Sequence, residues 1–184
     1  MVEVKGSAVT ARVRFVRDRY GEQGYRKLKD SLSAESRRAL DARVLPHAWA
    51  PFDLFIELNV RADELFGRGD LALCREMGRY SAEVNLPTLY RIFYKLGTPS
   101  FILRKAARLW DVHYSSGRLT VVGLEDGARL RIEDFAEPHR AHCSSVVGWA
   151  ERSVELSGGT ITYAEEELCR TRGDAACELV ARWK

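Results

Sequence analysis

The sequence predicts an α+β fold, in which a helical N-terminal part is followed by an antiparallel meander. Apolar residues recur at spacings of three and four through roughly the first hundred positions, as on one face of a helix. After residue 110 they alternate with polar residues at the period of a strand. The dipeptide Asp126-Gly127 separates two of the alternating runs and is a strong hairpin signal. Helices first and strands afterwards is the order typical of α+β proteins.

Residues 1–47 are expected to form a basic helical N-terminal extension. Val9, Val13, Val16 and Tyr20 make one apolar stripe, and glycines at 21 and 24 interrupt it before a second short helix. A third helix begins at Ser33 and ends before Pro46. The remaining faces of the first helix carry Arg12, Arg14, Arg17 and Arg19. We interpret these arginines as a solvated face, with contact to an acidic protein partner as the alternative.

The second predicted domain spans residues 48–184. Helices are expected over 52–67, 70–87, 89–96 and 98–109, and strands from about 112 onwards, including residues 119–121 and 130–132. A helix over 138–156 is inserted before a closing hairpin with strands at 160–163 and 177–183. The glycine pair at 158–159 ends that helix, and Arg172-Gly-Asp174 supplies the turn.

Composition limits the possible classes of protein. The 184 residues carry a formal net charge of +3, too small to indicate nucleic-acid binding by itself. No run of about 18 apolar residues predicts a membrane span, and the first residues lack the apolar core of a signal peptide. We therefore expect a cytoplasmic protein, where clustered cysteines indicate metal binding more than disulfides.

Four residues near the C-terminus are the candidate metal ligands: Cys143, Glu166, Cys169 and Cys177. Cys143 begins the inserted helix, Cys169 and Cys177 flank the hairpin turn, and Glu166 precedes Cys169 by three positions. Three thiolates with one carboxylate describe a closed, structural zinc site. The alternative is three small buried side chains beside a surface carboxylate. His142 is a possible replacement for Glu166, although a solvent-facing pair of His139 and His142 is the simpler interpretation.

The spacing Cys143-x4-Gly148, Gly159, Glu166-x2-Cys169-x3-Gly173-x3-Cys177 resembles the 4-vinyl reductase (4VR) domain. That resemblance covers about 35 residues and implies zinc held by the same four residues, in a fold similar to the α/β plait of TRAPP subunits. The opening Lys5-Gly-Ser-Ala8, Trp49-x-Pro51 and the final Trp183 also resemble a myxobacterial paralogous family of unknown function. The resemblance does not extend to the phenol-gripping positions of aromatic sensors, where this chain has Val122 and Tyr94.

The resulting hypothesis is a sensory or ligand-binding module and not an enzyme, since no phosphate loop, nucleophile elbow or HExxH motif is present. It would bind an apolar or aromatic small molecule and signal through a protein partner, with a homodimer expected. The pocket candidates are Tyr90, Phe93, Phe101 and Trp110, which would otherwise pack as core. A TRAPP-like interaction scaffold without a ligand is the second hypothesis. A haem- or tetrapyrrole-handling protein, suggested by the family name and by His113, is the third.

Overall fold

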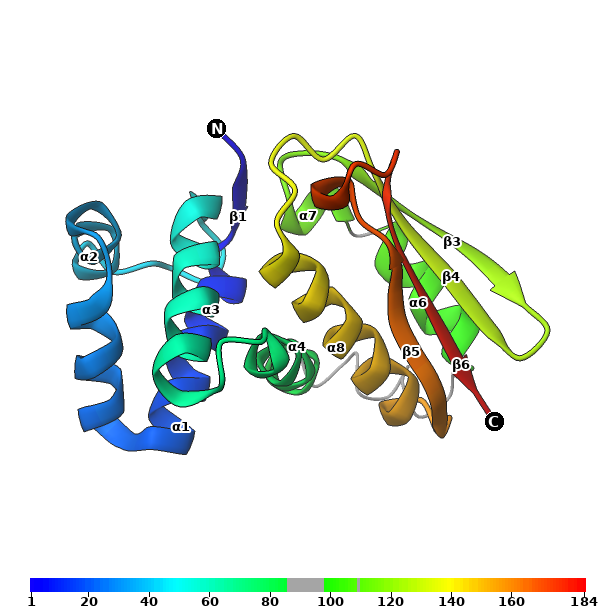
Figure 1. Ribbon diagram of the computed structural model, residues 1–184, viewed down its shortest axis with the longest axis horizontal. Helices are drawn as coiled ribbons and strands as arrows, with labels where there is room; N and C mark the ends of the chain where they lie inside the picture. Colours follow the sequence, from blue (N-terminus) through cyan, green and yellow to red (C-terminus); the bar gives the residue numbers. More distant parts are fainter. Residues whose placement is uncertain (86–97, 109) are drawn as a thin grey trace.

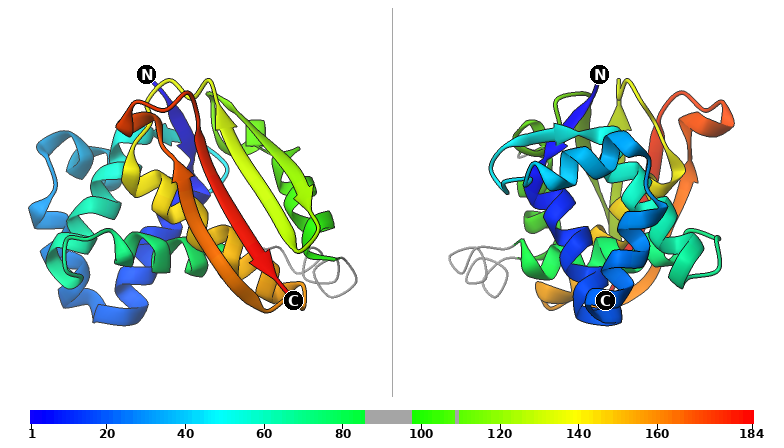
Figure 2. Two further views of the ribbon diagram at one scale, coloured as in Figure 1. Left: turned by 45° about the vertical axis from the view of Figure 1, so that its right-hand side comes forward. Right: turned by 90° about the vertical axis from the view of Figure 1, so that its left-hand side faces the viewer.

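A computed structural model describes residues 1–85, 98–108 and 110–184, and places a helical part beside a four-stranded sheet (Figure 1). Helices α1 (Gly6–Ser31), α2 (Ala34–Asp41) and α3 (Phe52–Phe66) form the helical part. Helices α4 (Ala72–Val84) and α8 (Arg140–Leu156) lie between this part and the sheet, as Figure 1 and the left view of Figure 2 show. The predicted α+β arrangement, with helices first and an antiparallel sheet afterwards, is confirmed.

Helix α1 is interrupted at Gly21, where the sequence predicted a break between two helices. Gly21 has a φ of 69° and a ψ of −176°, which are not helical values and which residues with a Cβ rarely adopt. The buried stripe of α1 includes Val9, Phe15, Val16 and Leu28. Ser33 caps α2 as its sequence predicted, because its side chain accepts a hydrogen bond from the backbone N–H of Ser36.

A short two-stranded sheet fixes the entry to α1. Strand β1 (Glu3–Lys5) pairs antiparallel with β2 (Trp49–Pro51), so the turn after α2 returns to the start of the chain. Val4, fully buried, also bridges to Tyr114 just after α7 (Trp110–His113). The first residues therefore contact both the helical part and the segment that leads into the large sheet.

Helix α4 is held at its start by a buried carboxylate. Asp63 of α3, 1% exposed, accepts hydrogen bonds from the backbone N–H groups of Leu71 (2.8 Å) and Leu73 (3.0 Å). The first turn of a helix has N–H groups without intrahelical partners, so this carboxylate satisfies part of that need.

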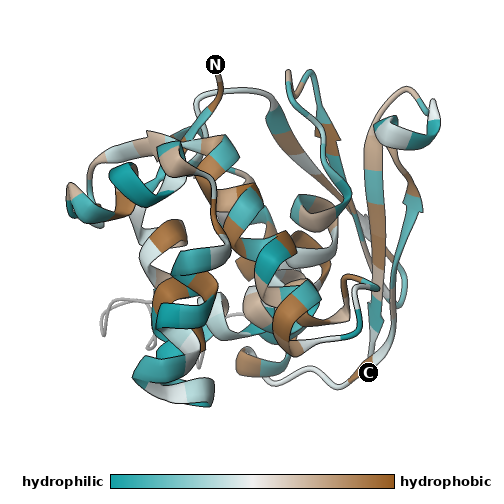
Figure 3. Cartoon of the chain, turned by 60° about the vertical axis from the view of Figure 1, so that its left-hand side comes forward, coloured by the Kyte–Doolittle hydropathy of each residue, from teal (hydrophilic) through white to brown (hydrophobic). Residues whose placement is uncertain are grey.

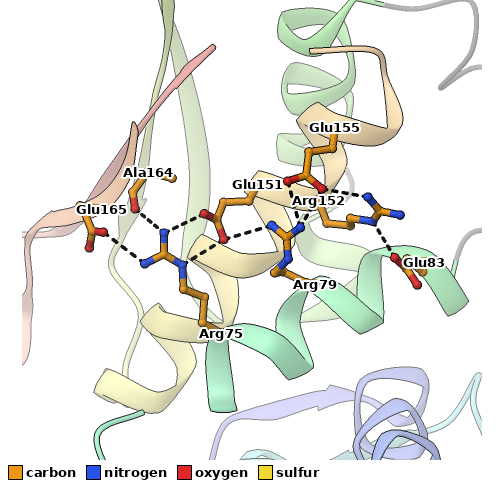
Figure 4. A network of polar contacts seen from close by, with 8 residues as sticks. All are labelled: Arg75, Arg79, Glu83, Glu151, Arg152, Glu155, Ala164 and Glu165. Atoms are coloured by element: carbon orange, nitrogen blue, oxygen red, sulfur yellow. Dashed lines mark hydrogen bonds and ion pairs between the residues drawn. The ribbon is translucent and has the colours of Figure 1, made fainter. Parts of the chain in front are cut away.

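Helices α4 and α8 touch backbone to backbone. A Cβ built on Gly78 would lie 2.0 Å from the carbonyl oxygen of Ser145, and one on Gly148 would lie 1.9 Å from that of Arg75. Along the same interface, Arg75, Arg79 and Arg152 pair with Glu151, Glu155 and Glu83, an ion-pair network drawn in Figure 4. The two helices are thus packed as one unit.

The large sheet has the order β3-β4-β6-β5 with every neighbouring pair antiparallel. Its strands are β3 (Arg118–Leu124), β4 (Gly127–Glu133), β5 (Ile161–Leu168) and β6 (Cys177–Trp183). Hydropathy alternates along the strands, as brown and teal bands show in Figure 3. Leu130 and Ile132 face the core, while Arg129 and Arg131 pair with Glu178.

The segment around residue 112 differs from the prediction. Residues 110–113 form the short helix α7 and not a strand, with the N–H of Tyr114 bonded to the carbonyl of Trp110. The helix predicted over 98–109 is present as α6 (Pro99–Ala107), and Thr98 caps it, since Phe101 N–H donates to Thr98 Oγ1. The predicted helix over 89–96 lies outside the described residues.

Buried apolar residues of the helical part and of the sheet belong to one cluster, which includes Val9, Leu58, Val147 and Leu130. The division of the chain at residue 47 stays a prediction. No helix within the described ranges has both the length and the apolar character needed to cross a bilayer.

Candidate metal-ligand cluster and interior aromatic cluster

The structure brings the four predicted ligand residues together. One ligand atom from each of Cys143, Glu166, Cys169 and Cys177 lies within 4.8 Å of the others, and the three thiols are free and buried. We call these four side chains the ligand cluster. Their role in binding a metal ion stays a prediction.

Three elements position the ligand cluster. Cys143 lies in the first turn of α8, Glu166 near the end of β5, and Cys177 at the start of β6. Cys169 precedes the 3-10 turn η1 (Arg170–Arg172), and Asp174 fixes it by accepting a hydrogen bond from its N–H at 2.7 Å. The register of β5 and β6 shifts between Glu166 and Leu168, so the ladder is irregular beside the cluster.

The environment of the cluster changes the pKa values of its three thiols. The Cys143 thiol is hydrogen-bonded to Cys177, and this bond together with burial raises the pKa of Cys143. The same bond, with a donation from the N–H of Arg170 at 3.5 Å, lowers the pKa of Cys177. Burial raises the pKa of Cys169. The cluster therefore favours a thiolate at Cys177, with Cys143 as its donor.

A small cavity borders the cluster. Cys143, Glu166 and Cys177 line it together with Glu178 and apolar residues such as Ile132, Val147 and Leu179. The polar side chains of the cluster therefore share a small space with apolar ones, an environment in which unpaired charge is costly.

A second arrangement, the interior aromatic cluster, lies between the helical part and the sheet. It consists of Phe52, Phe55, Trp110, Tyr114, Phe135 and His142. The ring of His142 meets the other five at centroid distances of 5.0 to 6.2 Å. Trp110 stacks on Tyr114 at 4.3 Å, and its indole N–H donates to the carbonyl of Ser116.

His142 was expected at the surface, and this interpretation was wrong. It is 1% exposed, and its Nε2 has no hydrogen-bond partner among the described residues. Burial, with the nearby charge of Arg12 and His139, lowers the pKa of His142 to about 3, so the imidazole is neutral at pH 7. His113, in contrast, is exposed and does not reach this cluster.

Arg12 was also expected on a solvated face, yet it is 2% exposed. Its guanidinium stacks on Phe55 at 4.6 Å and donates to Asn59 at 3.2 Å, and to the hydroxyls of Ser81 and Ser145. No described carboxylate forms an ion pair with it, and burial lowers the pKa of Arg12 to about 10. The signal was present in the sequence, because residue 12 follows Val9 by three and precedes Val16 by four.

Two of the four pocket candidates, Tyr90 and Phe93, lie outside the described residues, so a pocket formed by all four stays a prediction. Phe101 is 39% exposed and Trp110 is 5% exposed in the aromatic cluster. Trp110 therefore packs as core.

Comparison with solved structures identifies the fold of the chain. No protein-family model matches the sequence, and no curated protein matches it. Among solved structures, the chain is similar to an H-NOX protein from S. oneidensis in the Fe(II) state, with a TM-score of 0.78 and 11% identity, covering 98% of this chain and 96% of that one. The Fe(II)NO state of the S. oneidensis protein gives a TM-score of 0.77 at 11% identity, covering 98% and 99%.

An oxygen-binding H-NOX domain related to soluble guanylate cyclases, in its oxygen complex, is similar with a TM-score of 0.65 and 17% identity, covering 98% and 95%. Identities this low define the fold of the chain, which is the H-NOX fold. The last of these domains is described by the oxygen it binds and not by a reaction, in agreement with the expectation of a non-enzyme.

These findings correct the family placement. The resemblance to 4-vinyl reductase and TRAPP-like proteins, and with it the placement among the myxobacterial paralogues, is contradicted by the structural likeness over 98% of the chain. The spacing motif covered about 35 residues, too few to fix a fold. The main hypothesis, a module for an apolar or aromatic small molecule stapled by structural zinc, is wrong on the same evidence. The similar proteins are described with Fe(II), NO and oxygen, which favours the third hypothesis, haem handling, over structural zinc as the cofactor.

Whether this chain can hold haem depends on its own residues. All four histidines and all four cysteines lie in the described ranges. His47 and His113 are exposed, and Nδ1 of His139 accepts the N–H of Ala141 at the start of α8. Only His142 offers an imidazole nitrogen to the interior, and five aromatic rings pack directly on it. The described packing leaves no slot for a macrocycle beside His142, so the described residues do not fit haem at this imidazole.

Proposed function

We propose that the chain is a sensory domain of the H-NOX type that works without haem. The single observation that carries the proposal is coverage: the likeness spans 98% of this chain and 96% of the S. oneidensis protein. The similarity thus includes the helical part, the sheet and the interior between them. A likeness over nearly the full length of both chains supports a domain of that kind more than a shared fragment would.

The way the two parts are joined supports a sensory role. Helices α4 and α8 pack through Gly78 and Gly148 and carry the ion-pair network of Figure 4. Arg75 of α4 also donates to the carbonyl of Ala164 in β5 at 2.6 Å. Helix α4 contacts α1 and α3 as well as α8. A displacement of the sheet relative to the helical part would therefore change the contacts between α4 and α8.

The packing of the interior aromatic cluster supports the proposal that the domain works without haem. Phe52 meets Phe135 at 5.1 Å, and Phe135 meets Trp110 at 6.1 Å and Tyr114 at 5.8 Å. These rings occupy the interior with side chains that pack edge to face, an arrangement that stabilises a core. Opening the interior for a macrocycle would separate these rings and expose them.

Haem sensing is the second candidate, and one specific observation favours it. Nε2 of His142 is buried, neutral and without a described partner, which are the properties of an imidazole ready to bind a metal. Haem iron in proteins is commonly held by one such nitrogen.

Titration of the purified protein with hemin, followed by absorption spectroscopy, separates the two candidates. We expect no saturable Soret band at one equivalent, and spectra that match hemin mixed with a protein that does not bind it. The matched variants are His142→Ala and His113→Ala. A saturable Soret band that persists in His113→Ala and is lost in His142→Ala would overturn the haem-free proposal and establish the second candidate.

A further inference from the structure

We propose that strand β3, at the open edge of the large sheet, pairs antiparallel with β3 of a second copy of the chain and so forms a homodimer. The two four-stranded sheets would then be continuous across the dimer. This inference goes beyond the proposed function and does not depend on whether the interior binds haem. It rests on the difference between the two edges of the sheet, on the direction of backbone groups in β3 and on the charges at its ends.

The two edge strands of the sheet differ in how their backbones are covered. β5 forms one edge, and its register with β6 shifts twice. Arg75 of α4 donates to the carbonyl of Ala164 at 2.6 Å and Arg172 donates to that of Glu167 at 3.2 Å, so arginine side chains bind this strand. β3 forms the other edge, far from β5 in Figure 1, and pairs with β4 without a register shift. Of the described residues outside β4, none is hydrogen-bonded to the backbone of β3, which leaves a template for a further strand.

Alternate residues of β3 direct their backbone groups to the open edge. A two-residue turn joins β3 to β4, with Leu124 opposite Gly127. The closing pair of such a hairpin exchanges hydrogen bonds, and hydrogen-bonded pairs then recur at every second residue along the ladder. The same alternation, carried across the sheet, points the carbonyl of Ala164 outward from β5, where Arg75 binds it. The residues of β3 whose backbone groups face away from β4 are Leu119, Val121 and Gly123.

Antiparallel pairing about a two-fold axis at Val121 uses all of these groups. With Val121 opposite its own copy, Leu119 of each chain lies opposite Gly123 of the other, and each pair can exchange both N–H···O bonds. On the outer face of the sheet, Thr120 then lies opposite Val122 of the other copy, at the closer spacing of a non-hydrogen-bonded pair. Val122 is 59% exposed, so pairing would remove apolar surface from water.

Helix α6 adds an apolar contact on the inner face of the sheet. It packs beside β3, where the guanidinium of Arg104 approaches Gly123. Phe101 precedes Arg104 by three positions and therefore lies on the same face of the helix. Phe101 is 39% exposed, and a second copy bound at β3 would cover part of its ring.

Opposite charges at the two ends of β3 favour a second copy in the antiparallel direction. Arg118 begins the strand with a side chain that is 64% exposed, and the exposed Glu125 and Asp126 follow its last residue. Pairing about Val121 brings Arg118 of each copy to the acidic turn of the other. A parallel arrangement would instead bring the two Arg118 side chains together, where like charges repel.

Sedimentation velocity over protein concentrations from about 1 to about 500 µM tests the interface. One strand and part of one helix form less than a standard interface, so we expect a monomer–dimer equilibrium with a dissociation constant of roughly 10–100 µM. Gly123→Pro should raise this constant at least about 10-fold, because it removes an N–H that only the second copy uses, at two symmetric positions. Gly123→Ala is the matched control. It keeps the N–H, and the nearest atom to its Cβ, Arg104 Nη1, is 4.0 Å away, so it should associate like the wild type.

Val122→Lys keeps the test valid if the proline variant fails to fold, because this side chain is exposed. It places like charges close to each other across the two-fold axis and should also weaken the dimer at least about 10-fold, while its circular dichroism stays that of the wild type. A wild type that is monomeric at every concentration would overturn the proposal. A dimer of unchanged affinity in Gly123→Pro and Val122→Lys would overturn it as well, since the contact would then lie elsewhere. A Soret band in the hemin titration would refute only the haem-free function and would not affect this interface.

Discussion

Two polar side chains, Arg12 and His142, lie in the interior although they were expected at the surface. Arg12 occupies a position on the apolar stripe of α1, where a guanidinium is desolvated and compensated only by neutral acceptors among the described residues. Arginine suits such a place because its fixed fork can serve acceptors on several elements at once. Here it joins α1 to α3 through Asn59, to α4 through Ser81 and to α8 through Ser145.

We expect Arg12→Met to lower the free energy of unfolding by about 1–3 kcal/mol. Methionine fills much of the volume and removes a buried charge. It also leaves the side-chain amide oxygen of Asn59 buried without the hydrogen bond that Arg12 donates. Urea unfolding at pH 7 measures the effect. Arg14→Met on the same helix is the control, since its side chain is 64% exposed and pairs only with Asp18, and it should change stability by less than about 0.5 kcal/mol. An increase in stability for Arg12→Met would mean that burying the charge costs more than its hydrogen bonds return.

The ligand cluster was predictable from the sequence, whereas the interior aromatic cluster was not. Cys143, Glu166, Cys169 and Cys177 lie on a helix start and a hairpin whose local signals are strong, so their meeting follows from neighbouring elements. His142 adjoins Cys143 in the sequence, but its burial depends on Phe52 and Tyr114, which are distant in the chain. Hydrophobic periodicity does not report such contacts.

At the scale of elements, α2 depends on a carboxylate from another helix. Glu57 of α3 accepts hydrogen bonds from Ser33 N–H at 2.7 Å, from Ser33 Oγ at 2.8 Å and from the Ser36 hydroxyl. Burial alone would raise the pKa of Glu57, but these hydrogen bonds outweigh it and lower the pKa. The negative charge also lies at the N-terminus of α2, where the helix dipole favours it.

We expect Glu57→Gln to cost about 0.5–1 kcal/mol at pH 7, the usual size of a capping contribution. Because the pKa of Glu57 is lowered in the folded protein, its contribution is full above the unfolded value of about 4.3 and is lost as pH falls through the folded value. The stability difference between wild type and variant should therefore disappear in acid. Thermal unfolding from pH 7 down to pH 3 measures it, with Glu64→Gln as an exposed control on the same helix. A difference that does not change with pH would contradict the role of the ionised carboxylate.

Short elements were harder to predict than long ones. Helices α3, α4 and α8 and the strands β3, β4 and β6 follow from periodicity and turn signals. Residues 110–113 alternate like a strand, yet they form α7, because Trp110 and Tyr114 both turn into the aromatic cluster and stack there. Tertiary packing decides so short a segment, and no local pattern reveals it.

At the scale of the whole molecule, the fold is determined by packing between distant segments. The motif around the ligand cluster located four residues correctly but suggested the wrong family, because a hairpin and a helix start can hold the same residues in different folds. The likeness to H-NOX proteins at 11% and 17% identity has the same physical basis. A fold requires the order and apolar faces of its elements, which many sequences satisfy.

We expect the chain to unfold in one cooperative transition. The buried apolar cluster includes residues from α1, α3, α8 and the sheet, so neither part retains its core when the other opens. Circular dichroism, which reports mainly helices, and fluorescence of the four tryptophans, Trp49, Trp110, Trp149 and Trp183, should give the same midpoint in urea. Two separate midpoints would contradict this expectation and would support the division of the chain at residue 47.

The glycine contacts between α4 and α8 make this helix pair a fixed reference within the protein. With no side chain between the two backbones at Gly78 and Gly148, there is no rotamer that could change to let one helix turn against the other. Spin labels on exposed positions of the two helices should therefore report an invariant separation. Distances from this helix pair to labels elsewhere would then change only when the labelled element moves. Any such change can therefore be assigned to the helical bundle or to the sheet.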